Sequence, residues 1–226
     1  MGIFNFMRKD PLITGEYYHI YNRGVDKRDI FMNKGDLSRF ILSIKEFNTK
    51  KPIRSIRENE KNKSDIDRLK NKDNNGLVSI SCYCLNPNHF HFILKQKIDG
   101  GISEFFKRLL GGYTMYFNKS HHRNGALFQG KFKSKLIKDD QYFLMIRPYV
   151  NTNYLIHDIP EEKGHLVLSS CKEYDDLDFN LVAKEEAINI LEFYGSNKNF
   201  KNECLKVIAM IREERGKVLL SDNEDI

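Results

Sequence analysis

The hydrophobic pattern in the first half of the chain predicts strands and helices in a regular order. Residues 16–25 (EYYHIYNRGV) alternate as a strand, with Tyr17, His19 and Tyr21 on one face and a turn at residues 22–24. Residues 37–48 carry apolar side chains at helical spacing. The runs LVSISCYCL and NHFHFILKQ stand on either side of Asn86 and Pro87, and together they predict a β-hairpin.

The second half of the pattern continues with a helix over residues 99–119, bent or broken near Gly111 and Gly112. Residues 125–137 (GALFQGKFKSKLI) predict a strand or a second hairpin, and residues 139–157 predict a helix that begins at an aspartate cap. The stretch at about 52–76 is polar and charged, so we expect an excursion there without chemistry of its own. Beyond Pro160 the chain is acidic and helical by pattern.

The order strand, helix, hairpin, helix, strand, helix is typical of a split βαβ sandwich. We therefore predict an α+β fold of the ferredoxin or RRM-like kind, an antiparallel sheet with helices on one face, followed by a C-terminal helical extension. The expected division is a domain at residues 1–160 and an extension at residues 161–226. We expect the second face of the sheet to be open, lined with aromatic and basic side chains.

Charge is distributed unevenly along the 226 residues, whose formal net charge is +6. Residues 1–157 contain 28 Lys and Arg against 15 Asp and Glu, whereas residues 158–226 contain 9 against 16. Residues 107–138 hold eight basic side chains and no acidic one. Such a region attracts polyanions, of which nucleic acid is the commonest in the cytoplasm, although a solvated basic face without a partner is the alternative.

The remaining composition indicates a cytoplasmic protein. No apolar run approaches the roughly 20 residues that span a bilayer, and the N-terminal segment lacks the features of a secretion signal. Phe6 stands where a myristoylation signal needs Ser or Thr. Four scattered cysteines are too few for a secreted disulfide scaffold.

Two histidines, His89 and His91, lie one residue apart inside the apolar second strand of the predicted hairpin. Alternate strand residues share a face, so both imidazoles project to one side while Phe90 and Phe92 project to the other. Their Cα atoms are about 7 Å apart by strand rise, which lets two ring nitrogens converge on one metal ion. A pair of partly exposed histidines without a function is the alternative interpretation.

A metal site needs further ligands, and the sequence offers two sources. If the hairpin turns at Asn86 and Pro87, Cys84 opposes His89 and Cys82 opposes His91, which would make a closed structural zinc site; two small apolar residues in a strand are the simpler interpretation.

The other source is the last predicted helix. Tyr149 and Asn153 are four residues apart there, hence neighbours on one helical face; Tyr154 and Asp158 repeat that spacing, so spacing leaves both tyrosines open.

Three segments, CYCLNPNHFHFIL, YTMYFNKSHHRNGALFQGKFKS and DDQYFLMIRPYVNTN, resemble in this order the single-tyrosine HUH transposases. The insertion-sequence IS200-like enzymes and the REP-associated tyrosine transposases are the most similar groups, and the resemblance covers residues 17–155. It implies that His89 and His91 are metal ligands, that Asn153 gives the third ligand and that Tyr149 is the nucleophile. The chain has Tyr154 where such proteins often have Pro, and it has Pro148 directly before Tyr149.

The resemblance also implies an activity: cleavage and rejoining of single-stranded DNA through a 5′-phosphotyrosine, with a divalent metal, Mg²⁺ or Mn²⁺. The implied partner is single-stranded DNA with hairpin structure, and the implied assembly is a homodimer. For the DNA backbone we expect contacts from the basic residues Lys107, Arg108, Arg123, Lys131, Lys133 and Lys135. Tyr18, Tyr116 and Phe128 are candidates for base stacking, with core packing as the favoured alternative.

Three other functions fit the same sequence. A domesticated nucleic-acid-binding protein would keep the fold without cleavage. A zinc-stabilised interaction module would use Cys82, Cys84, His89 and His91. A metal-dependent phosphodiesterase would cut with water and form no protein–DNA bond.

Overall fold

The structure is a computed structural model of the whole chain, and it describes residues 11–53, 55, 56, 58, 76–157 and 159–221. The expected excursion at about 52–76 therefore lies almost wholly outside the described residues. The elements of the first half are β1 (Tyr17–Arg23), η1 (Val25–Lys27), α1 (Lys34–Phe47), β2 (Val78–Asn86), β3 (His89–Gln96), α4 (Gly101–Ser120) and β4 (Lys133–Leu136). They are followed by α5 (Asp140–Asn151), η2 (Asn153–Leu155), η3 (Glu161–Leu166), β5 (Leu168–Ser169), α6 (Ser170–Asp176), α7 (Lys184–Tyr194) and α8 (Asn197–Ser221).

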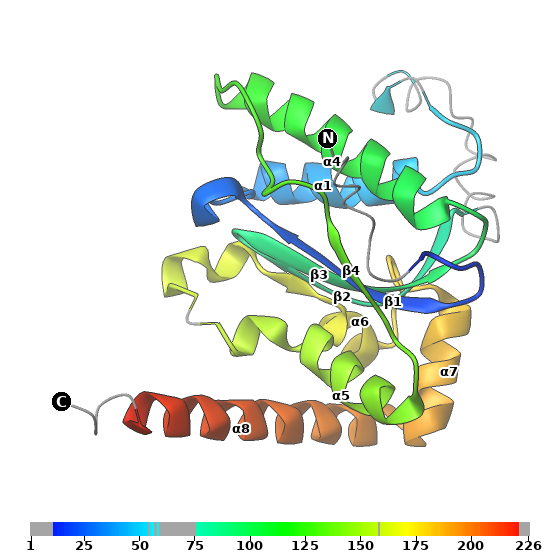
Figure 1. Cartoon of the computed structure of the whole chain (residues 1–226), viewed down its shortest axis with the longest axis vertical. Coiled ribbons are helices and arrows are strands. Elements are labelled where there is room, and N and C mark those ends of the chain that lie inside the picture. Colours follow the sequence, from blue (N-terminus) through cyan, green and yellow to red (C-terminus); the bar gives the residue numbers. More distant parts are fainter. Residues whose placement is uncertain (1–10, 54, 57, 59–75, 158, 222–226) are drawn as a thin grey trace, which may run out of the picture.

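The strands form one antiparallel sheet in the order β4-β1-β3-β2-β5. The first four strands have the connectivity of a split βαβ fold, so the predicted α+β class is confirmed, together with the helical C-terminal extension (Figure 1). In the register of β1 with β3, His19 is opposite Ile93 and Tyr21 is opposite His91. The side chains of His19, Tyr21, His89 and His91 thus share one face of the sheet.

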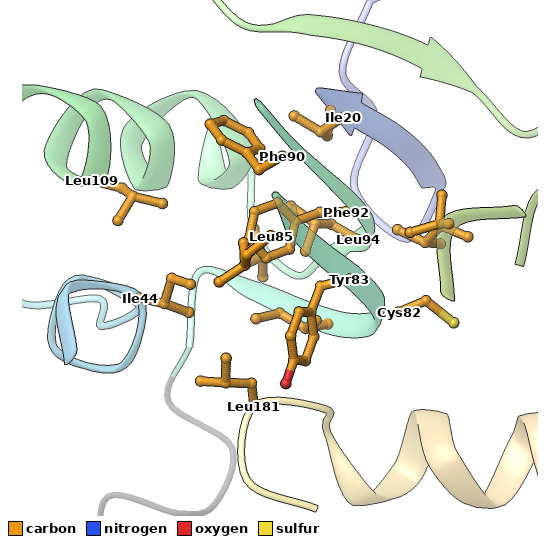
Figure 2. Close-up of a cluster of buried hydrophobic side chains, with 14 of the residues drawn as sticks. Ile20, Ile44, Cys82, Tyr83, Leu85, Phe90, Phe92, Leu94, Leu109 and Leu181 are labelled. Carbon is orange, nitrogen blue, oxygen red and sulfur yellow. The ribbon is translucent and has the colours of Figure 1, made fainter. Parts of the chain in front are cut away.

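Helices α1 and α4 cover the other face, where the phenylalanines of β3 form the core (Figure 1). The Phe90 ring stacks on Phe106 of α4 at a centroid distance of 5.9 Å and meets Phe40 of α1 at 5.8 Å. Figure 2 shows the side chains of Ile44 and Leu109 reaching this cluster from the two helices. The alternation of β3 that the sequence predicted is therefore confirmed on its apolar side.

The expectation that the second face is open is wrong. Helix α5 lies against it, and α7 and α8 pack below (Figure 1). The carboxylate of Glu186 on α7 accepts hydrogen bonds from Tyr17 Oη at 3.0 Å and from Ser81 Oγ at 2.6 Å. Short β5 adds to the edge of β2. The acidic extension thus completes the packing of the sheet, while the division of the chain at residue 160 stays a prediction.

Helix α4 runs without a break through Gly111 and Gly112, contrary to the predicted bend. A Cβ atom at Gly112 would lie 2.9 Å from two ring atoms of Phe47, the last residue of α1. Glycine is therefore needed for the close approach of the two helices and not for a change of direction.

Helix α5 begins at the predicted cap, where Asp139 Oδ1 accepts a hydrogen bond of 2.7 Å from the Tyr142 amide. It ends at Asn151, earlier than the pattern predicted, and Pro148 lies inside it. A proline leaves the carbonyl four residues before it without its helical donor. Here the hydroxyl of Tyr194 on α7 lies 3.4 Å from that carbonyl, Leu144 O, and donates to it. Within the described residues no helix is long and apolar enough to cross a membrane.

Candidate active site

A cavity of about 480 Å³ opens beside the two histidines of β3, on the face covered by α5. The rings of His89 and His91 lie with their centroids 5.3 Å apart and nearly perpendicular. The lining comes from β1, the segment between η1 and α1, the hairpin turn, β3, the segment before β4, β4 itself, α5, the segment after η2 and η3. It comprises Tyr21, Asn22, Arg23, Asp29, Pro87, Asn88, His89, His91, Gln129, Lys133, Tyr149, His157, Ile159, Pro160 and Lys163.

The His89 ring is held at both nitrogens. Its Nδ1 lies 2.6 Å from Asn88 Oδ1, which can only accept, so the ring carries its proton on Nδ1 and donates it. Its Nε2 lies 3.1 Å from Asn153 Oδ1 and 2.9 Å from Asn86 Nδ2. Burial lowers the pKa of His89 to about 4, so the ring is neutral at pH 7 and its Nε2 presents a lone pair.

Asn153 Oδ1 and His89 Nε2 direct their lone pairs at the same point, so their separation shows whether a cation fits between them. The same amide nitrogen, Asn86 Nδ2, lies 2.9 Å from Asn153 Oδ1 and 2.9 Å from His89 Nε2. Two ligands about 2.1 Å from one octahedral ion, at right angles, lie about 3 Å apart, which matches the 3.1 Å between the two acceptors. The nitrogen and oxygen donors at this separation fit a divalent cation, which would replace the Asn86 amide group as the partner of both.

His91 lies in a cluster of three rings. Its neighbours Tyr21 and His19 have centroids 5.7 Å and 5.1 Å from its own, with nearly parallel planes, and are themselves 5.1 Å apart. His91 Nδ1 is 2.8 Å from His19 Nε2, a hydrogen bond between two buried rings. Burial lowers the pKa of His91 well below its ordinary value and that of His19 to about 4, so both are neutral at pH 7.

Tyr149 reaches the same cavity from α5. Its half-buried ring meets His91 edge-on at a centroid distance of 5.9 Å and His19 at 6.2 Å. Asn153 is not on α5, as the four-residue spacing predicted, but begins the 3₁₀ turn η2 after the helix has ended. That turn nevertheless returns its amide to His89, so His89, His91, Asn153 and Tyr149 gather at one place.

Tyr154, the other tyrosine that spacing left open, does not line this cavity. It borders a second one, beside Cys171, and burial raises the pKa of its hydroxyl to about 12.

The cysteine pairing expected from the hairpin is wrong by two residues. The turn falls at Pro87 and Asn88, so Asn86 opposes His89, Cys84 opposes His91 and Cys82 opposes Ile93. Burial raises the pKa of the Cys84 thiol to about 12, which disfavours the thiolate that zinc requires. Across the described part of the chain, no group of three or more His, Cys, Asp or Glu side chains is arranged to hold a metal ion.

The predicted DNA-contacting residues divide between the two sides of the sheet. Lys133 and Lys135 on β4 lie on the side of the cavity, with their ammonium groups 5.9 Å from the Tyr21 ring and 4.2 Å from the Tyr142 ring. Lys107 and Arg108 lie on α4, across the sheet. Arg108 is bonded there to Glu104 Oε1 at 2.8 Å and to the Thr49 carbonyl at 2.7 Å.

The other two predicted contacts precede β4. Arg123 donates to Asn118 Oδ1 at 3.1 Å and covers the Phe117 ring, whereas Lys131 is exposed. The candidate stacking residues Tyr18 and Phe128 are buried in the core, so core packing is the correct interpretation for both. Tyr116 is half-buried under Arg39.

Sequence reasoning missed two residues of the site, Asn86 and His19. The strand pattern had placed His19 beside Tyr17 and Tyr21 without giving it a role, and only the register of β1 with β3 brings it to His91. Asn86 closes β2, and its opposition to His89 follows from the position of the turn.

An α+β sheet with a histidine pair, an amide oxygen and a tyrosine at one cavity is the arrangement that the family resemblance implied. Residues 47–153 match the model of the family described as "Transposase IS200 like". The match contains both histidines, Tyr149 and Asn153, and it confirms for this segment the resemblance to the IS200-like transposases.

Among solved structures, the chain is similar to one described as a REP-associated tyrosine transposase bound to a REP hairpin. The identity is 12%, the TM-score is 0.46, and the similarity covers 79% of this chain and 90% of the other. No curated protein matches the chain.

Proposed function

We propose that the protein cleaves and rejoins single-stranded DNA, with Tyr149 as the nucleophile and with His89, His91 and Asn153 as ligands of a divalent metal, Mg²⁺ or Mn²⁺. The observation that supports this best is the position of the Tyr149 ring, edge-on against His91 at the cavity into which the His89 side chain also faces. The match of residues 47–153 to the IS200-like transposases supports the reaction class.

In the proposed reaction the Tyr149 hydroxyl oxygen forms a bond to the scissile phosphorus, and the bond from phosphorus to the 3′ oxygen breaks. The phenolic proton leaves to solvent in the cavity, and the departing oxygen takes up a proton to become a 3′-hydroxyl. The DNA remains attached to Tyr149 by a 5′-phosphodiester, whose bond energy lets a 3′-hydroxyl reverse the step and join strands without ATP. A divalent cation at the site would polarise the phosphate and stabilise the added charge.

The chain's own residues prepare this step. Neutral His89 and His91 keep positive charge off the rings, so that they can act as ligands. Edge-on contact with the rings of His19 and His91 restricts where the Tyr149 ring can lie, which reduces the entropy lost on approach to the phosphate. Lys133, which lines the cavity, is placed to meet the DNA backbone close to the reacting bond.

The substrate we propose is single-stranded DNA with a hairpin, and the proposed assembly is a homodimer; both rest on the family resemblance of the motifs. Among the predicted backbone contacts, Lys133 and Lys135 are favoured because they project from β4 on the cavity side. Lys107 and Arg108 are the least favoured, because α4 lies across the sheet and both have carboxylate partners.

The test is formation of a covalent adduct with a labelled hairpin oligonucleotide in Mn²⁺, followed on a denaturing gel. Wild type is expected to form it, and Tyr149→Phe is expected to abolish it. Tyr154→Phe is the matched control, because it removes the same hydroxyl five residues away, beside a different cavity. An adduct that survives Tyr149→Phe contradicts the proposal. Binding without an adduct in any variant would favour a nucleic-acid-binding protein without cleavage.

A further inference from the structure

His19 makes a contact for which the proposed reaction has no direct use. Its ring is buried, comes from β1 and points at His91 from the side away from the hairpin turn, with 2.8 Å between His19 Nε2 and His91 Nδ1. Among the described residues, His91 makes no other side-chain hydrogen bond. The ring nitrogen of His91 that His19 leaves unengaged is Nε2.

A hydrogen bond between two neutral imidazoles exists in two forms. In one, His91 Nδ1–H donates to His19 Nε2, and His91 Nε2 carries a lone pair. In the other, His19 Nε2–H donates, His91 carries its proton on Nε2, and that nitrogen repels a cation. The direction of this single bond therefore decides whether His91 can be a metal ligand.

The neighbouring histidine shows which form the site uses. Asn88 Oδ1 can only accept, so it fixes the proton of His89 on Nδ1 and leaves Nε2 for the shared position near Asn153. Two histidines that bind one cation through Nε2 need the same tautomer. His91 has no amide oxygen at its Nδ1, and His19 occupies that place.

We propose that His19 is a positioning residue that accepts the proton of His91 Nδ1 and thereby holds His91 Nε2 ready for the divalent metal, as Asn88 does for His89. This deepens the proposed function and rests on its metal site. The same residue has a second contact, because the His19 ring forms half of the surface on which the Tyr149 ring lies edge-on. His19 thus connects the orientation of a ligand with the place of the nucleophile.

Two neighbouring rings support a fixed orientation of the His91 ring. Tyr21 and His19 lie beside it with interplanar angles of 16° and 17°, and their own centroids are 5.1 Å apart, so the three rings form one compact cluster. Both neighbours come from β1, which is hydrogen-bonded to β3 along its whole length. The His91 ring can therefore turn only if this cluster opens, so the hydrogen bond to His19 selects the tautomer of a ring that is already oriented.

The first measurement needs no metal and no DNA. In the metal-free full chain labelled with ¹⁵N at histidine, NMR distinguishes protonated from unprotonated ring nitrogens. Wild type is expected to carry the His91 proton on Nδ1. A wild-type spectrum with the proton on Nε2 overturns the proposal, and this result does not depend on any variant's folding.

The second measurement is Mn²⁺ affinity, followed by electron paramagnetic resonance. His19→Phe keeps an aromatic ring but removes the acceptor, and it is expected to weaken Mn²⁺ binding about 10- to 100-fold, the usual effect of losing such an outer partner. His19→Gln restores an acceptor and is expected to recover most of the affinity. Tyr154→Phe is the matched control, since it changes an aromatic side chain beside the other cavity and removes no proposed ligand.

A folded His19→Phe variant that binds Mn²⁺ as tightly as wild type would overturn the proposal. If His19→Phe does not fold, the proposal is tested by the tautomer of His91 in wild type and by the Mn²⁺ affinity of His19→Gln. Failure of the proposed function is separate: wild type would then form no DNA adduct, whereas the tautomer and the Mn²⁺ affinities would still follow His19.

Discussion

Acid is expected to destabilise the metal-free protein steeply, because three neighbouring imidazoles are buried in their neutral form. Burial lowers the pKa of His19 and His89 to about 4, and that of His91 well below its ordinary value. Well above pH 6.5 folded and unfolded chains bind equally few protons at these rings. As the pH falls below that value, the unfolded chain takes up protons that the folded chain refuses, so stability falls until the folded pKa is reached.

The magnitude follows from the two pKa values. A histidine with a pKa of about 4 when folded and about 6.5 when unfolded lowers the free energy of unfolding by about 2 kcal/mol between pH 7 and pH 5. His89 is less buried than the other two rings and contributes less, so the three rings together lower the free energy of unfolding by on the order of 5 kcal/mol. That is a large part of the about 5–15 kcal/mol by which a folded domain is stable.

The assay is urea unfolding at several pH values in the presence of a chelator, with free energies taken by linear extrapolation. His19→Phe removes one titrating ring and is expected to lose about 2 kcal/mol of the fall. Tyr21→Phe keeps all three histidines and is expected to show the whole fall. A wild-type free energy that is level from pH 7 to pH 5 would refute the reasoning, because the rings would then not be buried as neutral groups.

Three further predictions concern single side chains. Asn153→Ala should weaken Mn²⁺ binding about 10-fold or more, measured by electron paramagnetic resonance, because an oxygen donor is lost beside His89. Unchanged affinity would show that Asn153 is not a ligand. Glu186→Ala should lower the free energy of unfolding in urea by about 3 kcal/mol, because two hydroxyls lose a buried carboxylate acceptor. The same change at exposed Glu185 should cost less than about 1 kcal/mol, and equal costs would contradict the account. Lys133→Ala should reduce the slope of log affinity for DNA against log salt concentration by about 1, the value of one phosphate contact, and Lys107→Ala should leave the slope unchanged. A reduced slope for Lys107→Ala alone would place the DNA on α4.

Much of the fold was predictable because β3 carries an unambiguous alternation. Phe90 and Phe92 face one side and His89 and His91 the other, so this alternation alone predicts both the core face and the face of the site. The order of the elements then selected the split βαβ topology. The start of helix α5 at its aspartate cap was also predictable from the sequence.

The covered second face was not predictable by the same means. Glu186 meets Ser81 across 105 positions of sequence, and nothing in the local pattern of either segment indicates the other. The predicted bend at Gly112 was wrong for a related reason. A glycine that makes room for a ring from another helix has the same local sequence pattern as a glycine that breaks its own helix.

At the site, residue types and spacing made His89, His91, Asn153 and Tyr149 candidates, and the family resemblance grouped them. In the structure His89, His91 and Tyr149 line one cavity, and buried Asn153 contacts His89. Spacing alone left Tyr154 as a second candidate for the nucleophile, and the family resemblance favoured Tyr149. Asn86 could not be found, because its position opposite His89 depends on a turn that lies one residue later than expected.

The most direct test of the central claim is to locate the DNA on the protein. After reaction with a hairpin oligonucleotide and digestion of protein and DNA, mass spectrometry of the peptides is expected to find a 5′-nucleotide phosphate on Tyr149, dependent on the divalent metal. A nucleotide on Tyr154 or on any other residue, or cleaved DNA with no modified peptide at all, would contradict the account.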